Sequence, residues 1–261
     1  MPRKLDTVPG AIRARHTGAV FAPCEATCLA SDTERPASPS IALTITTPLG
    51  PAHGRWRPSS QRHAAVILLP GADNVLSGPA GLYDALGPAL QRAGAVAQLE
   101  YSTADSFIAR RDLILSVLDS FGRQGIERVV VIGWDLGGAL AIATGARSPL
   151  VTGVACLAPT IERCQSTQIN EDIAAINPRR LFIAHGSADR VAPQSASILL
   201  GANAGEQAEL ALYRGESHEF TRYRKALAQR LTAWATGVLS SPFRPRGARV
   251  SGPVPAVASH R

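Results

Sequence analysis

Short apolar runs alternate along the chain with segments whose hydrophobic residues have helical spacing. The expected strands are residues 41–48, 64–69, 95–101, the apolar run that leads from residue 128 into the turn at Gly133, and residues 151–157, 180–185 and 208–214. The expected helices are residues 82–93, 104–123, the segment after Gly137, 169–176, 194–202 and 219–238. Strands that alternate with helices predict an α/β fold, with a mostly parallel central sheet and helices on both faces. Residues 49–62 are polar and rich in Pro and Gly, so a loop is expected there.

The two ends of the chain differ in composition from the segment between them. Residues 1–40 predict a partly disordered N-terminal extension, and residues 241–261 predict a basic disordered tail. Residues 41–240 are expected to form one domain. The formal net charge of +7 comes entirely from residues 1–16 and 241–261, so the segment between them is neutral overall. Because a nucleic-acid enzyme more often carries its basic residues on the folded domain, no nucleic-acid partner is expected.

Hydrophobic patterning and cysteine usage narrow the class of protein. No apolar run has the length of a membrane span, and the first residues lack the apolar stretch of a signal peptide. A cytoplasmic protein without membrane contact is therefore expected. Cys24, Cys28, Cys156 and Cys164 lack the second pair or the His cluster of a zinc site, so free thiols and no metal are expected. No Gly-rich phosphate loop with a lysine is present, and no cofactor is expected.

The strongest local motif lies where the apolar run that begins at residue 128 ends. The sequence there is Gly133-Trp134-Asp135-Leu136-Gly137, and a helix-forming segment follows. This is the strand–turn–helix context of the G-x-S-x-G nucleophile elbow, with aspartate where serine is usual. The helix dipole favours an anion at this position, so Asp135 is expected to be ionised. The alternative is that Asp135 is an ordinary N-cap of the helix.

Two more chemically useful side chains follow later strands. Asp189 lies in a glycine-containing turn after the strand at 180–185, and His218 follows the last strand. In parallel sheets, ligands bind beyond the carboxyl ends of the strands. The chain order of nucleophile, acid and histidine is the order of an α/β-hydrolase triad. Asp135, Asp189 and His218 are therefore expected to be the catalytic residues, although Asp189 could simply cap a turn and His218 could be a surface residue.

These three segments resemble the α/β-hydrolase superfamily, and more closely its capless dienelactone-hydrolase-like branch. The resemblance covers about residues 40–240 and implies an α/β-hydrolase fold without a cap domain, since only about twenty residues separate the strands at 151–157 and 180–185. It also implies that the backbone N–H groups of Ala72 and Leu136 form an oxyanion hole. Pro70 stands where this family often has histidine.

Aspartate in the nucleophile position changes the expected chemistry. A carboxylate cannot replace a hydroxyl in ordinary acyl transfer without forming an anhydride, but it can attack an sp³ carbon such as that of an epoxide. Water activated by the histidine then cleaves the alkyl ester. Three explanations stay open: a native alkyl-ester nucleophile, an acid/base group in a non-hydrolytic cyclase or isomerase, or a replaced serine of an ester or lactone hydrolase. A catalytically inactive small-molecule-binding protein is the alternative from another class.

The remaining candidates concern substrate contact. Asp73 and Trp134 are expected to touch a small-molecule substrate, although Asp73 and Asn74 also fit a turn held by an Asx side chain. Glu162 is a reserve for the triad acid, and Tyr101 is interpreted as a packing residue. The sequence identifies neither the substrate nor the oligomeric state, and a homodimer stays open.

Overall fold

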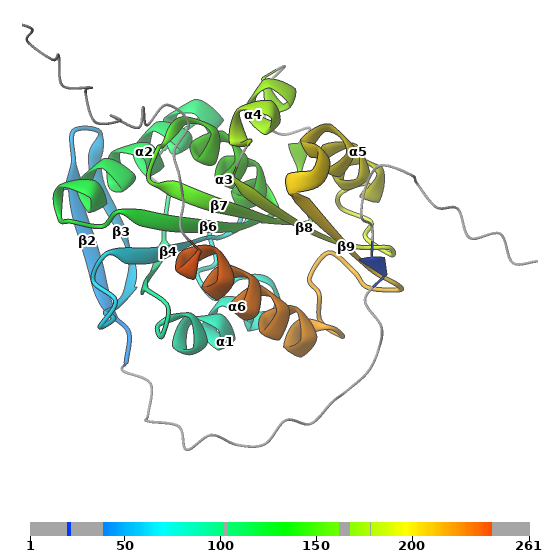
Figure 1. Ribbon diagram of the computed structural model, residues 1–261, viewed down its shortest axis with the longest axis horizontal. Coiled ribbons are helices and arrows are strands. Elements are labelled where there is room, and N and C mark those ends of the chain that lie inside the picture. The colour runs from blue at the N-terminus through cyan, green and yellow to red at the C-terminus, as the bar shows by residue number, and fades with distance from the viewer. Residues whose placement is uncertain (1–19, 22–38, 102–103, 162–167, 178, 242–261) are drawn as a thin grey trace, which may run out of the picture.

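The computed structural model describes residues 20–21, 39–101, 104–161, 168–177 and 179–241. The strands of these residues form one sheet in the order β1-β9-β8-β7-β6-β4-β5-β3-β2 (Figure 1). The strands are β1 (Val20–Phe21), β2 (Ile41–Thr47), β3 (Gly50–Arg57), β4 (Ala64–Leu69), β5 (Ala95–Leu99), β6 (Arg128–Trp134), β7 (Val151–Leu157), β8 (Arg180–Gly186) and β9 (Ala208–Tyr213). Only β3 pairs in antiparallel fashion, with β2 and β5, so the described sheet is mostly parallel.

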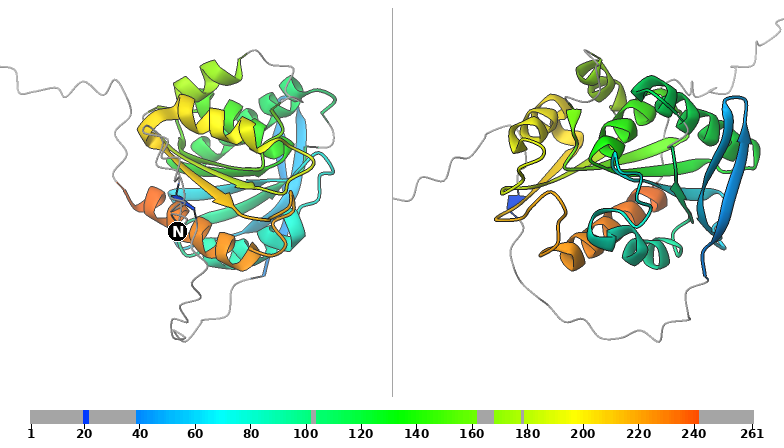
Figure 2. Two further views of the ribbon diagram at one scale, coloured as in Figure 1. Left: turned by 90° about the vertical axis from the view of Figure 1, so that its right-hand side faces the viewer. Right: turned by 180° about the vertical axis from the view of Figure 1, so that it is seen from behind.

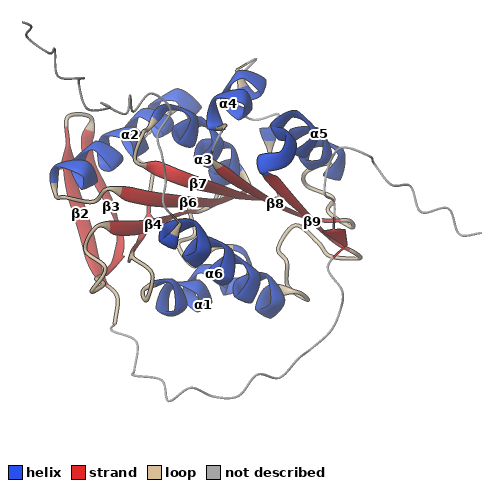
Figure 3. Ribbon diagram, viewed as in Figure 1, coloured by secondary structure: helices blue, strands red, loops and turns tan. Residues whose placement is uncertain are grey.

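Helices cover both faces of this sheet (Figure 3). They are α1 (Leu82–Leu90), α2 (Phe107–Arg123), α3 (Leu136–Arg147), α4 (Ile169–Ile176), α5 (Gln194–Ala204) and α6 (Arg224–Ser240). Helices α2 to α5 pack on one face, and α1 and α6 lie together on the other, as the two turned views in Figure 2 also show. None of the described helices is both long and apolar enough to cross a membrane.

The elbow strand β6 lies in the middle of the sheet and is buried from both sides. Val129 and Val131 belong to the apolar layer with α2 and α3, whereas Val130 and Ile132 belong to the layer with α1 and α6. Successive side chains of a strand point to opposite faces, so a strand covered on both faces must be apolar throughout. Each such side chain stabilises the fold by roughly 1.5–3 kcal/mol. This burial fixes the position from which Asp135 leaves the sheet.

The loop expected at residues 49–62 is wrong, because β3 occupies much of it. The Pro- and Gly-containing segment forms a hairpin with β2 and continues the sheet beyond β5. A Cβ atom at Gly54 would lie 1.9 Å from the carbonyl oxygen of Gln98, so the glycine permits the close approach of the two strands. Composition alone indicated a loop because β3 fully buries only Ala52 and therefore lacks an apolar run.

Other expected elements agree with the structure. β4, β7 and α4 begin and end at the expected residues, while α6 begins at Arg224 rather than near residue 219. Only residues 158–179 separate β7 from β8, and their helix α4 packs against α3, so no cap domain is present in the described residues. Most of the expected N-terminal extension and nearly all of the expected tail lie outside the described residues. Within the extension, β1 pairs in parallel with β9.

Candidate active site

Asp135 lies on a strained turn between β6 and α3. Its backbone has φ 54° and ψ −120°, a conformation that residues with a Cβ atom rarely adopt and that costs about 1–3 kcal/mol. Two small neighbours make the turn sterically feasible. A Cβ atom at Gly133 would lie 1.9 Å from the oxygen of Gly137, and one at Gly137 would lie 2.3 Å from the oxygen of Pro70. The turn thus has the shape of a nucleophile elbow, and it lifts the side chain of Asp135 above the sheet edge.

The carboxylate of Asp135 does not act as a helix cap. Its position is the N-cap of α3, but its side chain accepts no hydrogen bond from the helix. Instead, Oδ2 accepts a hydrogen bond of 3.0 Å from the backbone N–H of Ala72. The other oxygen, Oδ1, is buried and has no hydrogen-bond partner among the described residues. The capping alternative is therefore wrong, and the predicted oxyanion donor Ala72 binds the aspartate itself.

Asp189 follows β8 in a turn that fixes both of its carboxylate oxygens. Oδ1 accepts hydrogen bonds from the backbone N–H groups of Val191 at 2.7 Å and Ala192 at 2.9 Å. Oδ2 lies 2.7 Å from Nδ1 of His218 and 3.1 Å from Nε2 of His185. Because the side chain is fully buried, these contacts hold the carboxylate in one orientation.

His218 stands between the two carboxylates. Its Nδ1 contacts Asp189, and its Nε2 lies 3.8 Å from Oδ1 of Asp135. His218 and Asp135 are only 7% and 6% exposed, so bulk water screens this arrangement poorly. The indole of Trp134 lies beside the imidazole with ring centroids 5.2 Å apart, and its Nε1–H donates to the backbone oxygen of His218 at 3.1 Å. The structure thus brings together the three residues that the sequence predicts for the triad.

The electrostatics of Asp189 favour its charged form. Burial by itself raises the pKa of a carboxyl group, but the N–H groups of Ala192 and Val191 and the His218 ring more than offset it. The pKa of Asp189 is therefore held below its ordinary value. An ionised Asp189 accepts the Nδ1–H of His218, which leaves Nε2 directed at Asp135 to accept a proton.

Two tyrosines position the loop that carries Ala72. The hydroxyl of Tyr101 donates to the backbone oxygens of Pro70 and Gly71, and that of Tyr83 donates to Leu69 at 2.8 Å. Burial, above all, raises the pKa of Tyr101, and the negative charge of Asp135 adds to this effect, so its hydroxyl stays a donor. The sequence interpretation of Tyr101 as a packing residue missed this role. Its position two residues after β5, at the same end of the sheet as the loop of Ala72, was the available signal.

Glu216 is a second residue whose role the sequence did not reveal. Its carboxylate is buried, and it accepts hydrogen bonds from the backbone N–H groups of Ser217 at 2.8 Å and Tyr223 at 2.7 Å. These contacts join the segment before His218 to the residue that precedes α6. Glu216 therefore fixes the loop from which the histidine projects.

Of the remaining predicted residues, the structure describes Leu136 and Asp73 but not Glu162. Leu136 is buried and begins α3 directly after the elbow, and its role as an oxyanion donor stays a prediction. Asp73 is exposed, and its Oδ1 accepts from the N–H of Val75 at 3.2 Å, which is the Asx turn that the sequence offered as the alternative. Contact of Asp73 with substrate stays a prediction. Glu162 lies outside the described residues.

The cysteines contribute no site in the described part of the chain. Cys156 is a free thiol in β7, and burial raises its pKa to about 12, so the reactive thiolate is disfavoured. Cys24, Cys28 and Cys164 lie outside the described residues. Where side chains are described, no group of three His, Cys, Asp or Glu residues could hold a metal ion.

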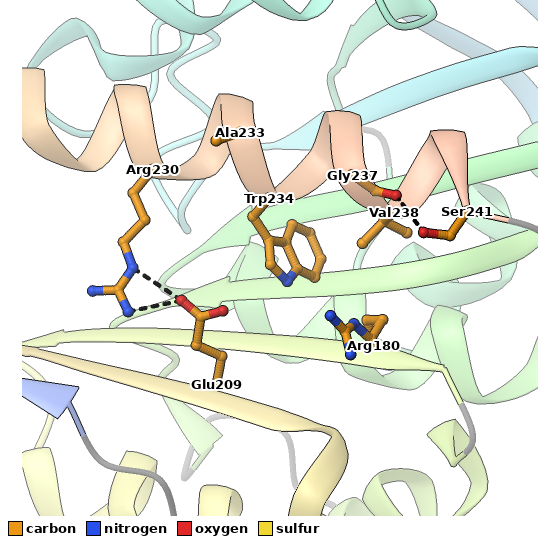
Figure 4. A pocket seen from close by; sticks show the side chains of 8 residues that line it. All are labelled: Arg180, Glu209, Arg230, Ala233, Trp234, Gly237, Val238 and Ser241. Carbon is orange, nitrogen blue, oxygen red and sulfur yellow. Dashed lines mark hydrogen bonds and ion pairs between the residues drawn. The ribbon is translucent and has the colours of Figure 1, made fainter.

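A separate cavity of about 370 Å³ lies between α6 and the strands β8 and β9. Figure 4 shows Trp234 in its wall and Arg230 paired with Glu209. Arg180 also lines this cavity, at the first residue of β8, whereas Asp189 follows the last residue of that strand. The cavity therefore lies toward the amino-terminal ends of these parallel strands, whereas Asp135, Asp189 and His218 follow the carboxyl ends of their strands.

Comparisons with known proteins agree with this fold. Residues 85–236 match the family described as "Dienelactone hydrolase family". Est1E from Butyrivibrio proteoclasticus is similar in structure with a TM-score of 0.68 and 12% identity, over 77% of this chain and 99% of that chain. The esterase domain of a Rhodothermus marinus protein is similar with a TM-score of 0.64 and 15% identity, over 77% of this chain and 99% of that chain. A Pyrococcus furiosus esterase is similar with a TM-score of 0.61 and 13% identity, over 77% of this chain and 90% of that chain. No curated protein sequence matches the chain.

Proposed function

The chain belongs to the dienelactone hydrolase family and is a hydrolase with the α/β-hydrolase fold, and on that premise we propose that it acts through a covalent alkyl ester on Asp135. The substrate in this proposal is a small organic molecule with an electrophilic sp³ carbon, such as an epoxide. Asp135 is the nucleophile, His218 the general base and Asp189 the group that orients His218.

One observation carries this proposal, namely the orientation of the Asp135 carboxylate. Its Oδ2 accepts the hydrogen bond of Ala72, and its buried Oδ1 has no hydrogen-bond partner among the described residues. Direct ester hydrolysis needs the Ala72 donor for the carbonyl oxygen of the substrate, and Oδ2 occupies it. Attack on an sp³ carbon places no negative charge on a carbonyl oxygen, so it leaves this hydrogen bond intact.

In the first step, Oδ1 attacks the carbon of the substrate and forms the alkyl ester. The carbon–oxygen bond of the epoxide breaks, its electron pair stays on the departing oxygen, and this oxygen takes a proton from water. Oδ2 becomes the carbonyl oxygen of the ester while it still accepts from Ala72. The elbow geometry thus prepares the ester for the second step, because its carbonyl oxygen already lies at the donor that stabilises an oxyanion.

In the second step, Nε2 of His218 takes a proton from water, and the oxygen of that water attacks Cγ of Asp135. The negative charge moves to Oδ2, where the Ala72 N–H stabilises it, and Leu136 supplies the second donor in this proposal. The intermediate then expels the alcohol oxygen, which takes the proton back from His218, and the resulting carboxyl group of Asp135 gives its proton to the hydroxide left by the first step. Asp189 stabilises the imidazolium between these two transfers, since it lies 2.7 Å from Nδ1.

The proposal is tested by incubating the protein with small epoxides and with p-nitrophenyl esters in parallel. Turnover of an epoxide is expected from the wild-type protein. In the His218→Ala protein, the alkyl ester should form but not hydrolyse, so intact mass measurement should show an adduct that maps to Asp135. No adduct and no turnover of either class, together with tight binding of one of these compounds, would replace this proposal with a binding function.

The Asp135→Ser protein separates a second mechanism that the same scaffold supports. Serine would free the N–H of Ala72 for a substrate carbonyl while it keeps His218 and Asp189 in place. Esterase activity gained in this protein, without epoxide turnover by the wild type, would indicate an ester or lactone hydrolase whose serine has been replaced. Epoxide turnover by the wild type that the serine protein loses would support the alkyl-ester mechanism.

A further inference from the structure

A second histidine contacts the acid of the triad. His185 is the sixth residue of β8 and is completely buried. Its Nε2 lies 3.1 Å from Oδ2 of Asp189 and 3.2 Å from the backbone oxygen of Ala192, and its Nδ1 lies 2.7 Å from Oγ of Ser197. Asp189 Oδ2 is therefore shared between the His185 ring and the His218 ring.

The partners of His185 determine which nitrogen carries the proton. A backbone carbonyl and an ionised carboxylate can only accept hydrogen bonds, so Nε2 must carry a proton to contact both. Nδ1 then accepts from the hydroxyl of Ser197, which can donate. Burial, above all, lowers the pKa of His185, so the ring is neutral. His185 thus presents one neutral N–H to the oxygen that also faces His218.

We propose that His185 is a positioning residue that tunes the general base, because its protonated Nε2 lies 3.1 Å from the same Asp189 oxygen that binds His218. The positive end of this N–H dipole, close to Oδ2, offsets part of the negative charge of that oxygen and weakens its attraction for a protonated His218. The neutral form of His218, which is the form that accepts a proton from water, is thereby favoured. Asp189 stays in place without this contact, since its Oδ1 keeps the N–H groups of Val191 and Ala192.

The charged groups around His218 are few in the described structure. Asp189 and Asp135 face its two ring nitrogens, and the buried Glu216 lies two residues before it with both oxygens bound to backbone N–H groups. The indole of Trp134 lies beside the ring at a tilt of 48° and carries no charge. His185 is therefore the neutral group through which Asp189 can be altered without changing the number of charges near His218.

The experiment follows the ring protons of His218 by NMR as a function of pH, with the His218→Asn protein used to assign the signal. In His185→Leu, the N–H group beside Oδ2 of Asp189 is lost, and the midpoint of the His218 titration should move upward by about half a pH unit, or roughly threefold in proton affinity. In His185→Gln, the side-chain amide can replace the Nε2 donor, and the midpoint should return toward the wild-type value. Because the ring is observed directly, the result does not depend on the proposed alkyl-ester chemistry.

Ser197→Ala provides the matched control. It removes the partner of Nδ1 but leaves the Nε2 donor, so it should lower the free energy of unfolding while the His218 midpoint stays at its wild-type value. If His185 only fills the core, His185→Leu and His185→Gln should both leave the midpoint unchanged, and the proposal would be wrong. A downward shift in His185→Leu would also contradict it. If His185→Leu does not fold, a His185→Gln midpoint far from the wild-type value would contradict it as well.

Discussion

Asp135 and Asp189 are both buried carboxylates beyond the ends of parallel strands, but their surroundings differ in kind. Asp189 has hydrogen-bond partners on both oxygens, two of them backbone N–H groups. Asp135 has one partner, a strained backbone and an oxygen without a hydrogen bond among the described residues. The turn after β8 therefore holds its carboxylate, whereas the elbow after β6 leaves one oxygen available.

The surroundings of Asp189 favour the stability of the fold, whereas those of Asp135 lower it. An unsatisfied buried oxygen costs about 1–3 kcal/mol, and a backbone conformation such as that of Asp135 costs a similar amount. A fold selected only for stability would remove both costs with another residue at the elbow. Strain of this kind clusters at functional sites, where the surrounding structure over-determines it. The elbow aspartate is thus the group in which chemistry is expected, and Asp189 is the group that supports it.

The largest expected effect is that of Asp135→Asn. The amide is a poor nucleophile, so turnover should be abolished, a fall of more than about ten-thousandfold. Its oxygen can still accept from Ala72, and the uncharged side chain suits a buried position better, so the melting temperature should stay the same or rise. Steady-state kinetics and thermal unfolding measure the two effects. Retained turnover would remove Asp135 from the mechanism, and the contrast with Asp189 would lose its chemical meaning.

Asp189→Asn is expected to have the next largest effect on turnover. The amide oxygen can keep the N–H groups of Val191 and Ala192, but the amide nitrogen would face Nδ1 of His218 and favour the wrong tautomer. Turnover should fall on the order of ten-thousandfold at most, with the fold preserved. Activity close to that of the wild type would make Glu162 the candidate for the acid in place of Asp189.

Tyr101→Phe tests the loop that presents Ala72. Loss of the hydroxyl leaves the backbone oxygens of Pro70 and Gly71 without this donor and should reduce the free energy of unfolding by about 1–2 kcal/mol. Turnover should fall by roughly tenfold, because the Ala72 donor is less well positioned. Tyr83→Phe is the control, since its hydroxyl contacts Leu69, three residues before Ala72. Equal losses of turnover in both proteins would argue against a specific role for Tyr101.

The pH dependence of the free energy of unfolding should reveal the contribution of the Asp189 carboxylate. The pKa of Asp189 is lowered in the folded protein, so its contribution to stability is present above its unfolded pKa of about 3.9. That contribution is lost as the pH falls through the lowered folded value. The difference in free energy of unfolding between the wild type and Asp189→Asn should therefore be constant near neutral pH and shrink below about pH 4. A difference that grows in acid would contradict the direction of the shift.

The smallest effect is expected from removing the chain ends. A protein of residues 17–240 keeps β1 and the whole site, so its melting temperature should lie within about 2 °C of the full chain. A second protein that begins at residue 39 lacks β1 and should differ only by the loss of that short pairing with β9. A large fall for residues 17–240 would show that the removed segments pack on the domain.

The sequence predicted most of the sheet because its central strands are buried on both faces. Such strands must be continuous apolar runs, and β4 and β7 were predicted to the residue. The strand β3 was missed because its neighbours satisfy its backbone while its side chains remain largely polar or small. Hydrophobic periodicity carries no signal for a strand of that kind.

The site was predictable as far as chain order carries information. Asp135, Asp189 and His218 each follow a strand, and parallel strands bring those ends to one edge. The contacts of Tyr101, Glu216 and His185 depend on side-chain positions in three dimensions, and no motif or period reports them. The same holds for the orientation of the Asp135 carboxylate, which excludes its role as a helix cap.

A single turnover in heavy-oxygen water tests the central claim most directly. Wild-type protein in excess over a small epoxide is allowed one turnover, and peptides containing Asp135 are then analysed by mass spectrometry. The alkyl-ester mechanism predicts that the heavy oxygen enters the Asp135 carboxylate, while the product receives an ordinary oxygen from the protein. Heavy oxygen in the product, with none in Asp135, would show that water attacks the substrate directly and would contradict the assignment of Asp135 as the nucleophile.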